Sequence, residues 1–336
     1  MIRMQKGKAL ISLRLAGLLA IFCAACRWSA AVAEDTQHVI VVLGAPGTPE
    51  YGAQFRQWAK RWIDAAKQGD ATSDLVAGNG ASSDRQLLTS TLAEKATVRT
   101  SEPLWLVLIG HGTFDGRTAR FNLEGPDITA DELKESLKGS VRPIAIINCA
   151  SCSSPFINAL GGPDRTVISS TKDGGEIQFA RFGDYISQAV SALEADIDRD
   201  GQTSLLEAWL YAARKTAEFY ESEGRLATEH ALLDDTGDGK GTRSEVFDGT
   251  RIRDSVENRA ELDGRLAARW HLVRSDDEKR LTPEQRRIRD GLEDQLEQLR
   301  SKKDELAESE YLLRLEKILL PLARIYESAD AESREK

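Results

Sequence analysis

The sequence has few of the residues on which most metal and redox sites depend. Its 336 residues include only four cysteines and four histidines, and none of them has the spacing of a zinc site. A glycine-rich phosphate loop and the Gly-x-Ser-x-Gly turn of serine hydrolases are also missing. The sequence therefore gives no support for a zinc enzyme, a nucleotide-phosphate site or a serine hydrolase of that type.

Long hydrophobic runs are also missing. The run Leu15–Cys26 has about a dozen residues, whereas a membrane-spanning helix needs about 20. Basic residues precede this run, and Ala31-Val32-Ala33 follows it with the small side chains that a signal peptidase recognises. We therefore expect a secretory signal peptide over residues 1–33, cleavage near Ala33, and no integral membrane span. The mature protein would be periplasmic or extracellular.

Positive charge is scarce once this segment is set aside. Its five basic residues take the net charge from −9 for the whole chain to −14 for the mature chain. A protein this acidic is expected to bind nucleic acid and anionic membranes poorly and to bind cations well. The segment also removes two cysteines, leaving Cys149 and Cys152, which are too few for a disulfide framework.

Short apolar runs alternate with amphipathic stretches over residues 34–250. The runs at 39–43, 104–109, 144–147 and 166–171 have the length and composition of buried strands, and helical patterns separate them. This alternation predicts an α/β domain with a mostly parallel sheet flanked by helices.

Two of these runs end in reactive side chains. Residues 104–109 are followed by Gly110-His111-Gly112, and residues 144–147 by Asn148-Cys149. Because parallel strands end along one edge of a sheet, we expect the imidazole and the thiol to meet there. Cys149 would be the nucleophile, His111 the general acid and base, and the amides of Gly112 and Cys149 the oxyanion hole. No third catalytic residue can be named.

The segments 106–112 and 144–151 resemble the paired signature of the caspase-like cysteine peptidases of clan CD, in order and in spacing. The Cys-x-Ser spacing is nearest to the legumain-like branch. The resemblance implies a caspase-like fold and a cysteine endopeptidase acting on peptide or protein substrates, with a pocket near residues 169–172. Asn148 stands where the branch usually has Ala. Cys152 stands where it usually has Gly, and Cys152 is an alternative nucleophile.

Two other functions remain open. A chain that has lost catalysis would be a calcium-dependent scaffold or interaction protein of the cell envelope. Cys149-Ala-Ser-Cys152 also has the spacing of a redox dithiol, so a thiol-redox protein is the third hypothesis.

Residues 196–207 have the pattern of an EF-hand-type calcium loop. Oxygen donors fall at loop positions 1, 3, 5, 9 and 12, a backbone carbonyl falls at position 7, and glycine stands at position 6. Helical patterns lie on both sides. The predicted ligands are Asp196, Asp198, Asp200, Gln202, Ser204 and Glu207.

Residues 234–245 follow the same register more weakly. Gly241 stands where an apolar residue normally packs, and a surface turn rich in Gly and Asp is an equal alternative. The predicted ligands of this weaker site are Asp234, Thr236, Asp238, Lys240, Thr242 and Glu245. Calcium is the only cofactor that the sequence indicates, and no organic cofactor is expected.

Residues 251–336 are rich in charge and leucine. Thr282-Pro283 begins a helix, and leucine stripes follow at helical spacing. We expect a helical appendage, either a hairpin with a break near Asp304 or a continuous coiled-coil helix, with a kink or an end at Pro321. Its leucine stripes are candidate partner surfaces.

Overall fold

A computed structural model describes residues 36–78, 83–253, 255–256 and 262–334. The predicted signal peptide lies outside these residues. The chain from Thr36 onward forms one compact unit, and the predicted division near residue 250 stays a prediction. Within the described ranges, no helix is both long enough and apolar enough to span a bilayer.

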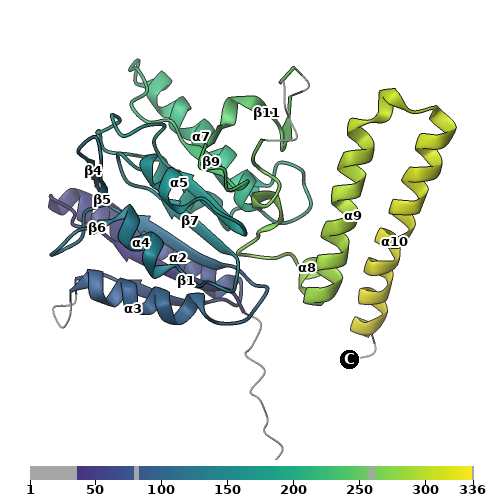
Figure 1. The fold of residues 1–336 in the computed structure, drawn as a ribbon, viewed down its shortest axis with the longest axis horizontal. Coiled ribbons are helices and arrows are strands. Elements are labelled where there is room, and N and C mark those ends of the chain that lie inside the picture. Colours follow the sequence, from purple (N-terminus) through teal and green to yellow (C-terminus); the bar gives the residue numbers. More distant parts are fainter. Residues whose placement is uncertain (1–35, 79–82, 254, 257–261, 335–336) are drawn as a thin grey trace, which may run out of the picture. The chain divides into compact units, whose positions relative to one another are not determined.

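The centre of the unit is a seven-stranded sheet in the order β10-β9-β8-β7-β3-β1-β2 (Figure 1). The five strands from β2 to β8 are parallel, whereas β9 and β10 are antiparallel to their neighbours. This arrangement confirms the predicted α/β class with a mostly parallel sheet. The strands are β1 His38–Leu43, β2 Thr72–Val76, β3 Leu104–Ile109, β7 Ile144–Asn148, β8 Arg165–Ser169, β9 Leu232–Asp234 and β10 Thr242–Arg243.

Helices bury both faces of this sheet. One face packs against α2 (Pro49–Gln68), α6 (Phe182–Ala189) and α7 (Leu205–Ser222). The other face packs against α3 (Asp84–Ala96), α4 (Ala130–Ser136) and α5 (Pro155–Leu160). Alternate residues of the central strands enter the two cores, which explains why these strands are almost wholly apolar.

Smaller elements follow the ends of the central strands. A three-stranded sheet of β4 (Gly112–Phe114), β5 (Ala119–Phe121) and β6 (Ile128–Thr129) begins directly after His111. The remaining elements among the described residues up to residue 270 are η1 Leu193–Ala195, η2 Ser244–Val246, β11 Phe247–Asp248, β12 Arg251–Ile252 and η4 Ala267–Arg269.

The C-terminal segment is a helical hairpin. It contains α8 (Asp276–Arg280), α9 (Pro283–Ser301), η5 (Lys303–Glu305) and α10 (Glu308–Arg334), so the chain turns where a break near Asp304 was expected. Of the two outcomes expected at Pro321, an end of the helix does not occur, because α10 continues to Arg334. A kink there stays a prediction. Ile318 and Ile325 are both buried on either side of Pro321, so α10 packs against its neighbours before and after the proline.

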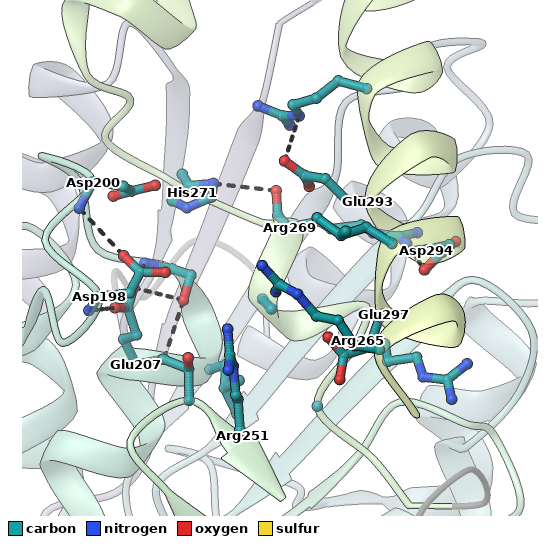
Figure 2. Close-up of a pocket in the computed structure, with 18 of the residues that line it drawn as sticks. Asp198, Asp200, Glu207, Arg251, Arg265, Arg269, His271, Glu293, Asp294 and Glu297 are labelled. Carbon is teal, nitrogen blue, oxygen red and sulfur yellow. Dashed lines mark hydrogen bonds and ion pairs between the residues drawn. The ribbon is translucent and has the colours of Figure 1, made fainter. Parts of the chain in front are cut away.

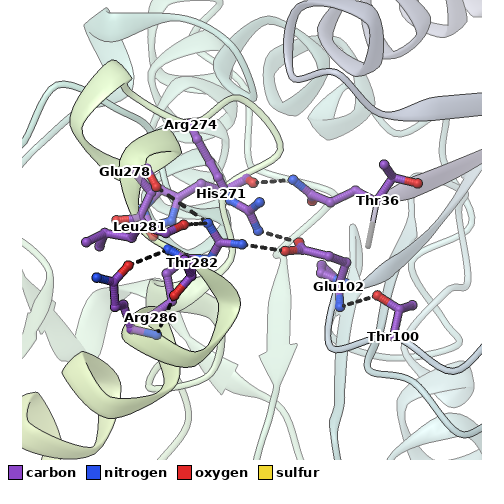
Figure 3. Close-up of polar contacts among 12 residues, drawn as sticks. Thr36, Thr100, Glu102, His271, Arg274, Glu278, Leu281, Thr282 and Arg286 are labelled. Atoms are coloured by element: carbon purple, nitrogen blue, oxygen red, sulfur yellow. Dashed lines mark hydrogen bonds and ion pairs between the residues drawn. The ribbon is translucent and has the colours of Figure 1, made fainter. Parts of the chain in front are cut away.

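Buried polar contacts hold the hairpin segment to the sheet domain (Figure 3). The Glu102 carboxylate lies just before β3 and is buried, with Arg274 and Arg286 as its ion-pair partners. The Nη2 atom of Arg286 lies 2.8 Å from Oε1 of Glu102. The Gln37 amide donates to the carbonyl of His271 at 2.9 Å, and its oxygen accepts from the indole of Trp105 at 2.7 Å.

Candidate active site and calcium loop

The structure places His111 and Cys149 at the same edge and on the same face of the sheet. β3 pairs with β7 in parallel, with Leu108 opposite Asn148, so both residues lie just past the ends of adjacent strands. Cys149 belongs to the core under α2 and α6. The His111 ring contacts Phe55, which belongs to the same core, with ring centroids 5.3 Å apart. The catalytic roles of the two residues stay predictions.

Aromatic side chains surround the His111 ring. The centroids of Tyr51 and Phe179 lie 5.2 and 6.1 Å from it, and these two rings stack on each other at 4.4 Å. The Nε2 atom of His111 lies 3.2 Å from the carbonyl oxygen of Pro46. These neighbours could not be predicted from the sequence, because they come from α2 and from the loop before α6.

The thiol of Cys149 is fully buried. A Cβ atom at Gly183 would lie 2.8 Å from Cβ of Cys149 and 2.7 Å from the Trp58 ring, so α6 approaches the thiol closely where it begins. Burial, reinforced by the nearby Glu229 carboxylate, raises the pKa of Cys149 far above its ordinary value. In this conformation Cys149 is a neutral thiol, whereas a nucleophile needs the thiolate.

Glu229 is a neighbour of Cys149 that was not predicted from the sequence. Its carboxylate is buried and accepts hydrogen bonds from the amides of Arg181 and Phe182 at 2.8 and 3.0 Å, and from the Tyr220 hydroxyl at 3.1 Å. Burial raises its pKa, and these hydrogen bonds oppose that rise. Glu229 therefore brings a carboxylate to the same region of the core as Cys149.

Both amides predicted for the oxyanion hole already have partners. The amide of Gly112 donates to Oγ of Ser151 at 3.3 Å, and that hydroxyl donates back to the Gly112 carbonyl at 3.2 Å. The amide of Cys149 donates to the carbonyl of Leu108 at 2.9 Å, as part of the sheet. In this arrangement neither amide is directed at a substrate oxygen.

Cys152 lies in a different environment from Cys149. Its backbone has a φ of 53°, in the left-handed region that most residues avoid, and its amide donates to the Glu176 carbonyl at 3.0 Å. Burial raises the pKa of Cys152, and the amide of Phe114 acts in the opposite direction. Both cysteines are free thiols in the structure.

Next to Cys152, a carboxylate and an imidazole form a close pair. Glu176 and His230 are 2.5 Å apart between Oε1 and Nδ1, and the same carboxylate accepts from the Lys172 amide at 2.9 Å. A hydrogen bond to Glu176 therefore holds one end of the predicted pocket segment 169–172. The hydroxyl groups of Ser170 and Thr171 lie 3.1 and 3.2 Å from Oγ of Ser153.

The first acidic loop brings three of its predicted ligands together. Oxygen atoms of Asp196, Asp198 and Glu207 lie within 4.8 Å of one another. Gly201 has a φ of 88°, which supplies the turn at loop position 6. Burial and the neighbouring carboxylates of Glu207 and Asp200 raise the pKa of Asp198 to about 6. A bound cation would relieve that repulsion, so the donor set suits a hard divalent ion such as calcium.

Only one of the two flanking helices of this loop has the predicted form. After the loop, α7 begins at Leu205 with a capping box between Ser204 and Glu207. Before it, where the helical pattern predicts a helix, α6 ends at Ala189 and the short 3-10 helix η1 leads into the loop. Asp200 accepts from both nitrogens of Gln202 at 3.0 Å, so loop positions 5 and 7 are linked to each other.

The second acidic loop is arranged less favourably for a metal. Glu245 pairs with Arg243 at 2.7 Å, and a 3-10 helix over Ser244–Val246, not an α-helix, contains the last two positions of the loop. Asp234 is buried in β9 and accepts from the amides of Gly237 and Gly239. Three carboxylates converge within 4.8 Å in the first loop, whereas the described residues of the second loop contain no such group.

A cavity of about 860 Å³ separates the first loop from the helical hairpin (Figure 2). Its wall includes Asp198 and Glu207 on one side and Glu293 on the other, with Arg251 and Arg265 extending between them. The buried His271 also lines it. The Ser275 amide donates to the Gln202 side chain at 3.1 Å, so a predicted calcium-loop residue is bonded directly to the C-terminal segment.

Of the three comparisons with known proteins, only the comparison with solved structures gave a match. No model of a known protein family matches this chain, and neither does any curated protein sequence. Among solved structures, the chain is similar to the Drosophila initiator caspase Dronc. The two chains share 15% sequence identity with a TM-score of 0.40, and the match covers 62% of this chain and 82% of Dronc.

Proposed function

We propose that this protein is an exported cysteine endopeptidase of caspase-like type, nearest the legumain-like branch, with a structural calcium ion. One observation carries the proposal: His111 and Cys149 follow adjacent parallel strands and face the same core. His111 takes the proton of the Cys149 thiol, the thiolate attacks the scissile carbonyl, and the imidazolium protonates the leaving amine. Water activated by His111 then hydrolyses the thioester.

The proposal requires a second conformation of the site. Cys149 is fully buried, and the Gly112 amide is bonded to Ser151. A substrate must displace the groups that bury the thiol, and it must take over the Gly112 amide for its oxyanion. The molecule described here is then the closed, inactive form of the enzyme.

A thiol-directed peptide inhibitor with an acyloxymethyl ketone group tests this function. The full mature chain is incubated with the inhibitor, with a reductant and with calcium, and the modified residue is found by mass spectrometry. We expect modification of Cys149 in the native protein. In His111→Ala this modification should be much slower, because the imidazole that accepts the thiol proton is missing. Cys152→Ala is the matched control and should be modified at the native rate.

The alternatives predict different results. If Cys152 is the nucleophile, modification moves to Cys152 and is lost in Cys152→Ala. A thiol-redox protein would instead reduce insulin with a dithiol as electron donor. Modification that His111→Ala leaves unchanged would contradict the peptidase proposal.

A non-catalytic, calcium-dependent scaffold is the second candidate. The neutral, fully buried Cys149 thiol and the two occupied amides favour it, because none of the three is arranged for catalysis in this conformation. Such a protein would bind calcium but would neither react with the inhibitor at Cys149 nor cleave a peptide library under any calcium concentration.

A further inference from the structure

Glu229 brings a buried negative charge to the candidate nucleophile. Glu229 is 3% exposed, and Cys149 is fully buried. The first turn of α6 connects the two side chains. The Glu229 carboxylate accepts from the amides of Arg181 and Phe182 at 2.8 and 3.0 Å. The next residue is Gly183, where a Cβ atom would lie 2.8 Å from Cβ of Cys149. The carboxylate and the thiol therefore contact the same turn of the same helix.

No cation pairs with this carboxylate within the described part of the chain. The guanidinium of Arg181 instead lies over the Phe219 ring, 4.1 Å from its centroid. The partners of Glu229 are hydrogen-bond donors, namely the two amides and the Tyr220 hydroxyl at 3.1 Å. Because an N–H group cannot accept a hydrogen bond, both amides favour the ionised carboxylate. The negative charge is thus held in the core without an ion-pair partner.

The charge acts on the titratable groups around it. Cys149 follows β7, Tyr185 lies on α6 and Tyr220 lies on α7. Burial is the main cause that raises the pKa of each of these groups, and the Glu229 charge acts in the same direction. Like charges repel strongly where water is excluded, so a thiolate at Cys149 is disfavoured by its surroundings and by this carboxylate.

Capping α6 does not by itself require a charge. The N-cap residue of this helix, Arg181, makes no side-chain capping bond, and Glu229 supplies the missing acceptor from a distant part of the chain. A neutral glutamine has a carbonyl oxygen that can accept from the same amides. The negative charge is therefore a property of Glu229 that its capping role leaves unexplained.

We propose that the Glu229 carboxylate suppresses ionisation of the Cys149 thiol, and so keeps the candidate nucleophile neutral and unreactive in the closed form. A neutral, buried thiol is also protected from oxidation. Glu229 contacts no substrate in this proposal and acts only through its charge. The inference rests on the proposed function in taking Cys149 as the nucleophile, but ionisation of the thiol can be measured whether or not the chain cleaves peptides.

Alkylation by iodoacetamide tests the proposal, because the thiolate is the form that reacts. The full mature chain is treated at mildly alkaline pH, and the modification of Cys149 is followed by mass spectrometry. We expect Glu229→Gln to speed this modification roughly tenfold, since the variant removes a nearby like charge. Asp84→Asn is the matched control. Asp84 is equally buried and accepts from the Gly78 amide, but it lies on α3 at the opposite face of the sheet. Its substitution should leave the rate unchanged.

Hydrogen exchange of the α6 amides separates the effect of charge from an effect on structure. Exchange at Arg181 and Phe182 should be the same in Glu229→Gln and the native protein, because glutamine keeps the acceptor. Faster alkylation with equally faster exchange would show that Glu229 only holds the helix in place, and would overturn the proposal. So would an unchanged rate of alkylation, or the slower rate expected if Glu229 accepted the thiol proton. Failure of the peptidase function is a separate result, because it appears as labelling that His111→Ala does not slow.

Discussion

At the scale of single residues, burial sets the protonation of several side chains, among them the predicted nucleophile and a predicted calcium ligand. It raises the pKa of Cys149 and of Asp198, because the charged form of each loses contact with water. For His271 the same cause acts in the other direction and lowers the pKa to about 3, because the cationic imidazolium is the form that burial penalises. Neighbouring Arg289 adds to this effect.

His271 should therefore make folding stability depend on pH. In the unfolded chain the imidazole binds a proton below pH 6.5, whereas in the folded protein it stays neutral down to about pH 3. Unfolding then takes up a proton in this range, so stability falls as pH falls from 6.5 toward 3. Between pH 7 and pH 5 the expected loss from His271 is about 2 kcal/mol in the free energy of unfolding.

Urea denaturation of the native protein and of His271→Asn measures this contribution. Asparagine can keep the hydrogen bond to the Arg269 carbonyl but does not titrate. The difference in stability between the two proteins should change with pH over this range by the amount given above. Parallel stability curves for the two proteins would show that His271 does not titrate on unfolding.

Only part of the candidate active site could be predicted from the sequence. The positions of His111 and Cys149 at one edge of the sheet could be predicted, because each follows an apolar run in the chain. The burial of Cys149 could not, since Gly183 and Trp58 cover it from helices far away in sequence. Glu229 was missed for the same reason.

At the scale of elements, local signals in the sequence mark where several helices begin. Capping boxes begin α4, α7 and α9, and each was visible as Thr or Ser followed three residues later by Glu or Gln. The strand β2, in contrast, was not predicted, because its sequence Thr72-Ser-Asp-Leu-Val76 is mostly polar and exposed at a sheet edge. Only its pairing with β1 makes it a strand.

The calcium loop leads to a prediction at this scale. Glu207 has two roles: it caps α7 together with Ser204, and it is the expected bidentate ligand at loop position 12. Glu207→Gln keeps the capping box, because glutamine also bonds the N-cap amide, but it removes the charge that the predicted calcium ion would contact. Calorimetric titration should show calcium affinity falling at least about tenfold, or roughly 1.4 kcal/mol.

Glu132→Gln is a matched control for this loss. Glu132 forms the equivalent capping box with Thr129 at the start of α4, away from the acidic loops. Its substitution should leave calcium affinity unchanged. If both variants bind calcium like the native protein, the 196–207 loop is an acidic turn without a metal.

At the scale of the whole molecule, charges far apart in sequence join the hairpin segment to the sheet domain. Glu102 is separated from Arg274 by 172 positions and from Arg286 by 184 positions, yet its buried carboxylate accepts from both guanidinium groups. A sequence pattern could predict that residues 283–301 form a helix. It could not show which buried acid the arginines of that segment would meet, since all three are common charged residues in unremarkable positions.

Removing the Glu102 charge should therefore destabilise the protein more than removing an exposed one. Glu102→Gln leaves two partly buried guanidinium groups without their carboxylate, and the expected loss is about 3 kcal/mol in the free energy of unfolding. Glu284→Gln is the matched control, because Glu284 pairs with Arg287 on the exposed surface of α9. It should leave the urea midpoint unchanged, since solvent screens that pair.

Limited proteolysis adds a readout of position: in Glu102→Gln, cleavage between residues 274 and 286 should become faster than elsewhere, because these arginines hold that segment to the sheet domain. Equal urea midpoints for the two variants would mean that apolar packing, and not the Glu102 cluster, holds the segment in place.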